Sequence, residues 1–314
     1  MKNFAITGVA GYIAPRHLEA IKVTKNNLVA SLDNHDSVGI LDRYFPNSSF
    51  FIEFERFERH LEKLKRSSSS EQIDYLSICS PNFLHDAHIR LALRIGADAI
   101  CEKPVVLNPW NIDALEELEN ETGKKIFNVL QLREHKAIID LKNKVEKENR
   151  NSKYDIVLTY VASRGSWYDF SWKGLIEKSG GVATNIGVHF FDMLGWIFGK
   201  VQSNKLYLRE DRQVSGFLEL ERANVRWFLS LEKEDLPEAS IKNNESTFRS
   251  LLLDGEEFQF SDGFTDLHNK VYKSILDGRG FGLNDARQSI EIVHKIRSSD
   301  LEIKNKYPHP LIKL

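Results

Sequence analysis

The chain has 314 residues, which is enough for two domains at about 100–200 residues each. Its 43 lysines and arginines nearly balance 45 aspartates and glutamates, and the net charge of −2 argues against a protein that binds nucleic acid through bulk positive charge. Hydrophobic residues make up 41% of the chain, which excludes a mostly disordered protein, and no apolar run approaches the roughly 18 residues of a membrane span.

The first half of the chain alternates short β-branched runs with helical patterns. Strands are predicted at residues 4–7, 28–32, 49–52, 73–79, 97–101 and 125–130. Helices are predicted at 14–21, 55–65, 85–95, 112–122 and 135–148, and a polar loop at 67–70. Such alternation is typical of βαβ units built around a parallel sheet.

After about residue 150 the pattern changes. Strands predicted at 154–162, 205–208, 214–220, 225–231 and 248–253 alternate as antiparallel strands do, with helices at 185–198, 266–276 and 285–296. We therefore predict an α/β chain with two domains. Residues 1–133 form a Rossmann domain with a doubly wound parallel sheet, and residues 134–314 form an α+β domain with an open, mostly antiparallel sheet.

The two cysteines, Cys79 and Cys101, are too few for a disulfide framework, and no cysteine–histidine cluster has the spacing of zinc ligands. Both lie in apolar runs, where free thiols are usually buried and inert. The sequence therefore predicts no metal site, and the compartment that we expect is the cytoplasm.

The turn after the first strand reads Gly8-Val9-Ala10-Gly11-Tyr12-Ile13-Ala14. Glycine is needed where a backbone turns tightly and approaches a pyrophosphate, and a small residue where the helix packs on the sheet. Gly8, Gly11 and Ala14 have this order, although the spacing is one residue longer than usual. The pattern is a weak signal alone, and its position at the first turn of a βαβ unit favours dinucleotide binding.

An acidic residue at the end of the second strand supports this prediction. Asp33 there would accept hydrogen bonds from both ribose hydroxyls and would repel a 2′-phosphate, which favours NAD over NADP. Asp36 is the other candidate, and one of the two is expected to be only a turn residue.

Two further strand ends carry polar side chains. Ser80 and Asn82 follow the fourth strand, at the sheet edge where open α/β sheets bind ligands, although either residue could cap the next helix instead. Lys103 lies between Glu102 and Pro104 at the end of the fifth strand. In a cofactor crevice, a positive nicotinamide and desolvation would lower its pKa toward that of a base; the alternative is a solvated lysine before a turn proline.

One helix of the second half has a polar face. Asn185 and His189 are four residues apart on it, and Asp192 follows three residues later. A histidine held in a cleft exchanges a proton near neutral pH, whereas a lone histidine among apolar residues more often belongs to the core.

Together these features resemble the Gfo/Idh/MocA oxidoreductase superfamily over nearly the whole chain. The glycine turn, the triplet Glu102-Lys103-Pro104 and the segment Gly180–His189 occur in the order and spacing of that family. The resemblance implies an NAD-binding domain and a C-terminal α/β domain whose open sheet often forms the oligomer interface. It also implies hydride transfer between a sugar or cyclitol carbon and the nicotinamide. Asn185 is a departure, because many members have aspartate there.

Four segments, Ala10–His17, Gln131–Arg133, Ser163–Tyr168 and Ser171–Gly174, give a finer resemblance. They are similar to those of bacterial UDP-N-acetylglucosaminuronate 3-dehydrogenases, which oxidise the sugar 3-hydroxyl in the synthesis of 2,3-diamino sugars for lipopolysaccharide O-antigens. Some of these enzymes recycle bound NADH with 2-oxoglutarate. The alternatives are a UDP-N-acetylglucosamine 3-dehydrogenase, a dehydrogenase of free sugars or inositol, and a non-catalytic NAD-binding regulator.

The resemblance also implies residue roles. Lys103 and His189 would flank the reacting hydroxyl, with Lys103 favoured as the base. The residues implied in NAD binding are Gly8, Gly11, Tyr12, Ile13, Asp33, Asp36, Ser80, Asn82, His85, Glu102, Lys103 and Gln131. Those implied in binding the UDP-sugar are Lys103, Arg133, Arg164, Tyr168, Ser171, Lys173, Asn185 and His189. The implied assembly is a homo-oligomer, either a dimer or a tetramer.

Overall fold

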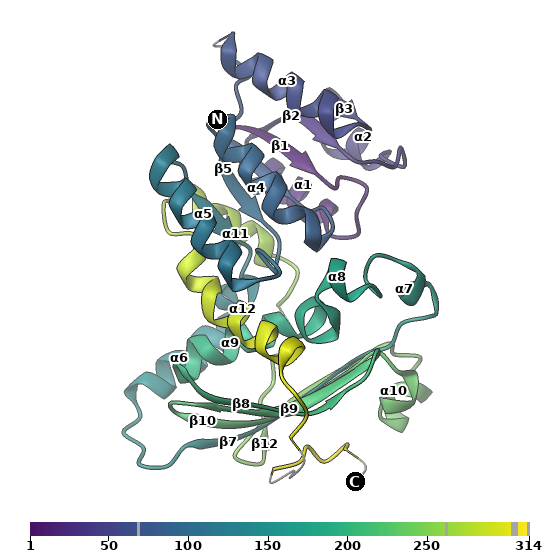
Figure 1. Cartoon of the computed structure of the whole chain (residues 1–314), viewed down its shortest axis with the longest axis vertical. Coiled ribbons are helices and arrows are strands. Elements are labelled where there is room, and N and C mark those ends of the chain that lie inside the picture. The colour runs from purple at the N-terminus through teal and green to yellow at the C-terminus, as the bar shows by residue number, and fades with distance from the viewer. Residues whose placement is uncertain (68–69, 261–262, 303–306, 313–314) are drawn as a thin grey trace. The chain divides into compact units, whose positions relative to one another are not determined.

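The structure, a computed structural model, describes residues 1–67, 70–260, 263–302 and 307–312 (Figure 1). Ser68 and Ser69 of the predicted polar loop lie outside the described residues. The chain forms two compact units, the first made of Met1–Gln131 and Thr265–Arg287 and the second of Leu132–Phe264 and Gln288–Leu314. The segment 265–287, which we expected in the second domain, therefore returns to the first unit.

The first unit contains a sheet of six parallel strands in the order β3-β2-β1-β4-β5-β6. The strand order reverses between β1 and β4, and doubly wound sheets bind ligands at the carboxyl edge of this reversal. The strands are β1 (Asn3–Thr7), β2 (Asn27–Leu32), β3 (Ser49–Phe51), β4 (Tyr75–Ile78), β5 (Asp98–Cys101) and β6 (Ile126–Asn128).

The helices between these strands have apolar faces that explain where they pack. On α3 (Phe54–Arg66) the buried residues are Phe57, Leu61 and Leu64, a spacing that places them on one side of a helix. The other helices of the unit are α1 (Ala14–Val23), α2 (Ile40–Tyr44), η1 (Asn82–Leu84), α4 (His85–Arg94), α5 (Pro109–Thr122), α11 (Leu267–Leu276) and the start of α12 (Leu283–Ser298). The five residues of α2 are too few to show a helical period, and we did not predict it.

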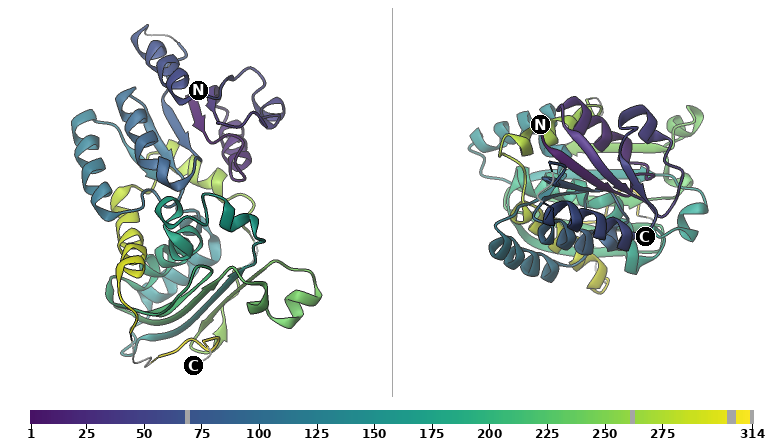
Figure 2. Two further views of the ribbon diagram at one scale, coloured as in Figure 1. Left: turned by 45° about the vertical axis from the view of Figure 1, so that its right-hand side comes forward. Right: turned by 90° about the horizontal axis from the view of Figure 1, so that it is seen from above.

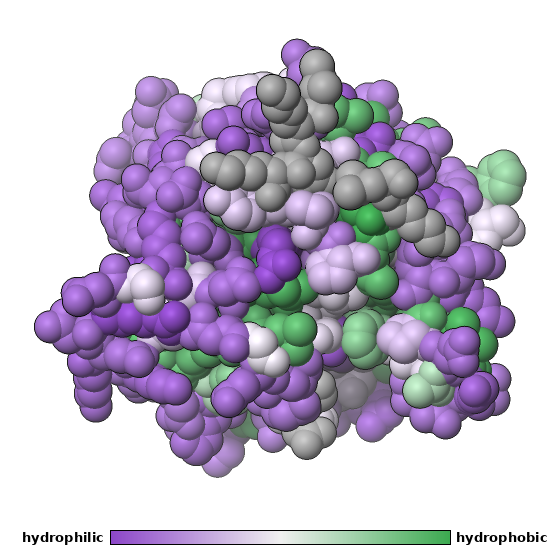
Figure 3. Space-filling model, turned by 90° about the horizontal axis from the view of Figure 1, so that it is seen from below, coloured by the Kyte–Doolittle hydropathy of each residue, from purple (hydrophilic) through white to green (hydrophobic). Residues whose placement is uncertain are grey.

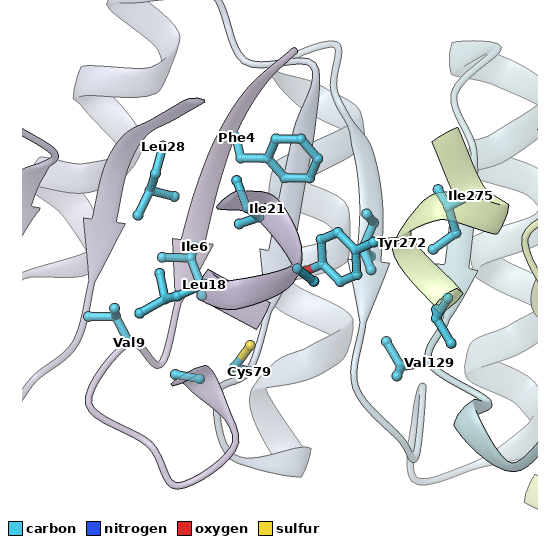
Figure 4. Close-up of a cluster of buried hydrophobic side chains, with 14 of the residues drawn as sticks. Phe4, Ile6, Val9, Leu18, Ile21, Leu28, Cys79, Val129, Tyr272 and Ile275 are labelled. Atoms are coloured by element: carbon cyan, nitrogen blue, oxygen red, sulfur yellow. The ribbon is translucent and has the colours of Figure 1, made fainter. Parts of the chain in front are cut away.

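The return of α11 is explained by the core of the first unit (Figure 4). Tyr272 of α11 is fully buried, and its ring stacks on that of Phe4 in β1 with 5.9 Å between the centroids. Ile275 joins the same cluster, together with Leu18 and Ile21 of α1. Sequence periodicity identifies the buried face of a helix but not the surface that covers it, which is why the expected domain assignment of this segment was wrong.

The sheet of the second unit has the strand order β12-β11-β7-β10-β9-β8. All neighbouring pairs are antiparallel except β7 and β10, which pair in parallel over eight residues of each strand. The strands are β7 (Tyr154–Ala162), β8 (Val201–Arg209), β9 (Gln213–Leu220), β10 (Ala223–Ser230), β11 (Thr247–Leu253) and β12 (Glu256–Glu257). The predicted open, mostly antiparallel sheet is confirmed.

One face of this sheet packs on α9 (Val188–Phe198), as the ribbon views show (Figure 2). Phe191 meets Trp227 of β10 edge to face, and Phe190 lies 4.9 Å from the ring of Tyr160 in β7. The remaining helical elements are η2 (Gln131–Glu134), α6 (Lys136–Lys147), α7 (Trp167–Phe170), α8 (Ile176–Ser179), η3 (Ala183–Gly187), η4 (Lys233–Asp235) and α10 (Glu238–Lys242).

The other face of the sheet is covered in part by the C-terminal segment. The ring of Tyr307 stacks on Phe217 of β9, and the ring of His309 stacks on Phe228 of β10. Seen from below, the surface is mostly hydrophilic, and hydrophobic residues are visible between the hydrophilic ones (Figure 3). Within the described ranges, no helix combines the length and apolar character needed to cross a membrane.

Candidate functional site

Gly8 brings three strand ends of the first unit together. Its φ of +78° lies in the left-handed region, and a Cβ atom on it would lie 2.5 Å from the backbone oxygen of Cys79. Its amide donates a 2.8 Å hydrogen bond to the carbonyl of Leu32, at the end of β2. The residue therefore joins β1, β2 and β4 at the reversal of strand order, where no other residue type fits.

The carboxylate of Asp33 holds the glycine turn. Its Oδ2 accepts a 2.9 Å hydrogen bond from the Ala10 amide, and its Oδ1 accepts one of 3.0 Å from the His35 amide. Each carboxylate oxygen has a further lone pair for a ribose hydroxyl. Asp36, the other candidate, is exposed, and its carbonyl accepts from the Val38 amide. Of the two acids, Asp33 is therefore the one that contacts the turn.

The glycine turn leaves two backbone donors at the start of α1. The Gly11 amide donates to Gly8 and the Ala14 amide to Gly11, whereas those of Tyr12 and Ile13 have no acceptor within the described part of the chain. Among the residues that the structure describes, no side chain caps this helix. Donors at the positive end of a helix are what a pyrophosphate requires, so the turn fits a dinucleotide.

Buried polar contacts hold the end of β4. The hydroxyl of Ser80 lies 2.9 Å from Nδ1 of His88, which also lies 3.1 Å from the hydroxyl of Thr7. Burial lowers the pKa of His88 to about 4, so the imidazole is neutral at pH 7. Asn82 is also buried, at the start of η1. Ser80 and Asn82, which we expected to bind NAD, thus lie at the predicted edge with their side chains below the surface.

His85 connects the ends of β4 and β5. Its Nε2 lies 2.9 Å from the Ser80 carbonyl, and its Nδ1 lies 2.7 Å from the carbonyl of Pro104. Because the ring is almost fully buried, desolvation lowers its pKa. In this structure the expected cofactor ligand His85 supports the turn that carries Lys103.

Glu102 lies at the centre of a buried hydrogen-bond network. Its Oε1 is 2.9 Å from Nε2 of His17 in α1 and 2.9 Å from Nε2 of His268 in α11. Nδ1 of His17 lies 2.7 Å from the hydroxyl of Tyr272, which lies 2.7 Å from the hydroxyl of Ser77. Despite the cost of desolvation, the hydrogen bonds and positive potential of the two imidazoles hold the pKa of Glu102 well below its usual range.

Two histidines and a carboxylate are also ligands that divalent metals use, and the spacing in the sequence predicted no such group. Their ligand atoms lie within 4.8 Å of one another. Tetrahedral zinc ligands with bonds of about 2.0–2.1 Å are about 3.3 Å apart. The two separations of 2.9 Å from Glu102 are shorter than that and are those of hydrogen bonds.

Lys103 is half-buried at the carboxyl end of β5, and the peptide bond to Pro104 is cis. The Lys103 amide donates to Oε2 of Glu102 at 3.2 Å. The side-chain amide of Asn128 in β6 donates to the carbonyls of Cys101 at 2.9 Å and Glu102 at 3.3 Å. The backbone around Lys103 is therefore held by two side chains, the carboxylate of Glu102 and the amide of Asn128. Gln131, the last expected NAD residue, is half-buried at the start of η2.

In the second unit, Asn185 lies in a π-helical turn, η3, directly before α9. Its side-chain amide donates a 2.8 Å hydrogen bond to the hydroxyl of Tyr168, and both side chains are buried. His189 follows one turn later and is half-buried. Single π-helical turns within helices are frequent at functional sites, which agrees with the polar face predicted here.

A short loop of the second unit gathers the expected substrate residues around Tyr168. The hydroxyl of Ser171 donates to the Tyr168 carbonyl at 2.8 Å and accepts from the Lys173 amide at 3.2 Å. The Lys173 ammonium lies 4.7 Å from the centre of the Trp172 ring, a cation–π contact. Burial, and next the charge of the half-buried Arg164, lower the pKa of Lys173.

Arg133, which we expected to bind the substrate, pairs with an acidic side chain of the second unit. Its guanidinium forms two hydrogen bonds with Asp192, Nε to Oδ2 at 3.0 Å and a terminal nitrogen to Oδ1 at 2.7 Å. Both side chains are buried within the second unit, and the guanidinium also lies over the ring of Trp196. In these contacts the buried positive charge of Arg133 is neutralised by the carboxylate of Asp192.

Sequence reasoning missed His17, His268 and Tyr272. His17 belongs to the segment Ala10–His17 that we compared with the family, but nothing in its local pattern pairs it with Glu102. The available signal was a histidine on the buried face of an amphipathic helix, and that pattern is more often core. Cys79 and Cys101 are buried free thiols, as predicted.

Comparisons with known proteins agree with this geometry. The family model for an oxidoreductase family with an NAD-binding Rossmann fold matches residues 2–130, and that for its C-terminal alpha/beta domain matches residues 153–242. The WlbA (WbpB) dehydrogenase from Thermus thermophilus is 48% identical, and the match covers 99% of this chain and 100% of that one. Its TM-score is 0.95 for the complex with NAD and alpha-ketoglutarate and 0.94 for the complex with NAD and UDP-GlcNAcA.

Two curated enzymes are more distant. Glucose-6-phosphate 3-dehydrogenase from Bacillus subtilis is 23% identical over 319 residues, covering 99% of this chain and 77% of that enzyme. D-glucoside 3-dehydrogenase from Escherichia coli is 28% identical over 131 residues, which are 40% of this chain but only 36% of that enzyme. With both family models matched in order, the chain belongs to the Gfo/Idh/MocA family of oxidoreductases, whose N-terminal domain binds NAD.

Proposed function

We propose that this chain oxidises the 3-hydroxyl of UDP-N-acetylglucosaminuronic acid to a ketone, with NAD as the oxidant. The observation that supports this most is the 48% identity, over 99% of the chain, to a dehydrogenase whose structure was determined with NAD and UDP-GlcNAcA. The names of two curated relatives, both 3-dehydrogenases of glucose derivatives, favour carbon 3 as the reacting position. The reaction would then belong to 2,3-diamino sugar synthesis for O-antigens, a proposal supported by the resemblance of the segments Ser163–Tyr168 and Ser171–Gly174.

Lys103 and His189 are the proposed catalytic residues. NAD, when bound, accepts the hydrogen of carbon 3 together with its electron pair. The neutral amine of Lys103 takes the proton of the 3-hydroxyl, so that the C–O single bond becomes a carbonyl. His189, half-buried on α9, orients that hydroxyl or relays its proton. The glycine turn and Asp33 hold the dinucleotide.

The anionic groups of the substrate are assigned to the loop around Tyr168. A diphosphate and a uronate carboxylate need cationic partners, and Arg164 and Lys173 are both half-buried there. The pKa of Lys173 is lowered by burial and by the charge of Arg164, an effect that a bound anion opposes. The ring of Trp172, beside Lys173, offers a flat surface for the uracil or the sugar.

We further propose that 2-oxoglutarate serves as the recycling oxidant. The related dehydrogenase was crystallised with alpha-ketoglutarate, the same compound. Its ketone carbon would accept the hydrogen that NAD had taken up, with a proton, and would leave as a 2-hydroxy acid. A cytoplasmic location and a homo-oligomeric assembly remain predictions.

Absorbance at 340 nm tests the proposal directly. Purified protein and NAD are incubated with UDP-N-acetylglucosaminuronic acid, UDP-N-acetylglucosamine, glucose 6-phosphate and myo-inositol, each with and without 2-oxoglutarate. We expect turnover with the uronate alone, and product formation that continues past one equivalent of NAD only when 2-oxoglutarate is present.

The other outcomes separate the alternatives. Turnover with UDP-N-acetylglucosamine but not with the uronate would contradict the assignment of a carboxylate ligand. Oxidation of a free sugar would contradict a nucleotide site near Arg164 and Lys173. If NAD binds and no sugar is oxidised, the chain is a non-catalytic NAD-binding protein and the proposed function is wrong.

A further inference from the structure

We propose that Glu102 is a positioning residue, whose buried carboxylate fixes Lys103 in the orientation that the reaction requires. The proposal rests on the proposed function, because it takes Lys103 as the group that receives the proton. It extends that function to His17 and His268, for which neither the sequence patterns nor the comparisons suggest a role.

The hydrogen bonds around Glu102 are consistent with one arrangement of protons. The amide of Lys103 donates to Oε2, so Oε1 accepts from the two histidine Nε2–H groups. With Nε2 of His17 protonated, its Nδ1 accepts from the hydroxyl of Tyr272. The Tyr272 oxygen then accepts from Ser77. In this arrangement the carboxylate of Glu102 accepts all three hydrogen bonds, from one backbone amide and two imidazoles.

The network connects two distant parts of the sequence to the backbone of Lys103. His17 lies on α1, immediately after the glycine turn, and His268 lies on α11 with Tyr272 one turn later. Glu102 is 6% exposed, and both histidines are buried. The position of the Lys103 amide therefore depends on the helix that begins at the NAD turn and on the helix that returns from the C-terminal half.

Stability alone does not account for these residues. Burying a carboxylate costs free energy that neighbours only partly restore, and replacing buried ionic groups by hydrophobic ones is often neutral or stabilising. The charge also lies one residue from Lys103. A fixed negative charge near a lysine favours its protonated form, which develops as the sugar hydroxyl loses its proton.

Glu102→Gln and His268→Phe are the test variants, measured as full-length protein with NAD. Glutamine replaces one acceptor oxygen by an NH₂ group, which then faces an N–H donor. Phenylalanine keeps most of the ring volume and removes one donor. We expect kcat for the UDP-sugar to fall about 10- to 100-fold in both, with KM and the NAD dissociation constant within about twofold of wild type.

Cys101→Ala is the matched control, because Cys101 is fully buried next to Glu102 and its thiol donates to the carbonyl of Val105. We expect it to lower Tm and leave kcat unchanged. If Glu102→Gln and His268→Phe keep the wild-type kcat, or lose activity only in proportion to their Tm as an unstable protein would, the positioning role is wrong.

A second measurement does not depend on turnover. After reductive methylation with ¹³C-formaldehyde, the Lys103 signal, assigned by its loss in Lys103→Arg, is followed by NMR in the NAD complex. We expect this signal to shift in Glu102→Gln and His268→Phe and not in Cys101→Ala. If the Lys103 signal is unchanged in both variants, the positioning role is wrong, whether or not a sugar is oxidised. If the signal shifts in the variants but the wild-type protein oxidises no sugar, only the proposed substrate is wrong.

Zinc binding is a further test of the network. Zinc that raises the Tm of the wild type but not that of His268→Phe would show that the three side chains are metal ligands, and the hydrogen-bond network would then be wrong.

Discussion

The side-chain amide of Asn185 donates a 2.8 Å hydrogen bond to the hydroxyl of Tyr168, and both groups are buried in the second unit. Here the neutral amide anchors the loop that carries Arg164 and Lys173 to the turn that precedes His189. Burial raises the pKa of Tyr168, so its hydroxyl stays protonated at neutral pH.

We expect Asn185→Ala to destabilise the protein by about 1–3 kcal/mol, because it leaves the buried Tyr168 hydroxyl without its donor. Tyr168→Phe should have a similar effect, because the Asn185 amide then loses its acceptor. Urea unfolding of the two variants and of the double variant measures this. If the two losses simply add in the double variant, the hydrogen bond contributes no coupling and the anchoring role is wrong.

Variants of the ion pair between Arg133 and Asp192 can distinguish a structural role of Arg133 from a role in substrate binding. Removing either partner leaves a buried charge, so Arg133→Leu and Asp192→Leu should each cost about 3–5 kcal/mol in urea unfolding. The double variant removes both charges and should recover most of that loss. Its KM for the UDP-sugar is then informative. A KM near that of wild type excludes the substrate role implied by the family resemblance, and a KM raised more than tenfold restores it.

Lys103→Ala should abolish turnover while leaving NAD binding within about twofold of wild type, because the proposed role of Lys103 is proton transfer. NADH formation and NAD binding by calorimetry measure the two properties. Lys63→Ala, an exposed lysine on α3, is the control and should behave as wild type. Normal turnover in Lys103→Ala would refute the assignment of the base.

The sequence predicted the strands and helices of the first unit well because their patterns are local. Phe57, Leu61 and Leu64 mark the buried face of α3 at helical spacing, and β1 and β2 are short apolar runs between polar turns. The short helices α7 and α8 have four residues each, too few for any period. The position of α11 could not be predicted, because its apolar face is compatible with either unit.

Some residues of the candidate site could likewise be predicted from local patterns, and others could not. Gly8, Asp33 and Lys103 lie at strand ends, and the alternation of strands and helices is enough to bring strand ends to one edge. The contacts of Glu102 depend on His17 and His268, which come from helices that no local pattern pairs with β5. For Arg133 the family resemblance implies a ligand role, and the structure adds a buried ion pair with Asp192 that no local pattern predicted.

His88 makes stability depend on pH. Burial lowers its pKa to about 4, below the value of about 6.5 in an unfolded chain. As the pH falls from 6.5 toward 4, the unfolded state binds a proton that the native state does not, and stability is therefore lost. For one such group the loss between pH 6.5 and 4.5 is about 2 kcal/mol. His88→Gln should remove that part of the acid dependence in urea unfolding, whereas His35→Gln, at an exposed position, should leave it unchanged.

Gly8 and Gly39 provide a matched test of the turn at the NAD site. At Gly8 a Cβ atom would lie 2.5 Å from the backbone oxygen of Cys79, and its φ is +78°. At Gly39 no other described residue, apart from its two chain neighbours, comes within 4 Å of such a Cβ, and φ is −53°. Gly8→Ala should therefore lower Tm and weaken NAD binding at least tenfold, because the alanine forces β1 away from β4 and moves the donors at the start of α1. Gly39→Ala should leave NAD binding unchanged and stabilise the protein slightly, by about 0.4–1 kcal/mol, because alanine lowers the conformational entropy of the unfolded chain.

Thermal unfolding and NAD titration of both variants test this prediction. Equal NAD affinity in the two would mean that the close approach of Gly8 to β4 is not what shapes the dinucleotide site.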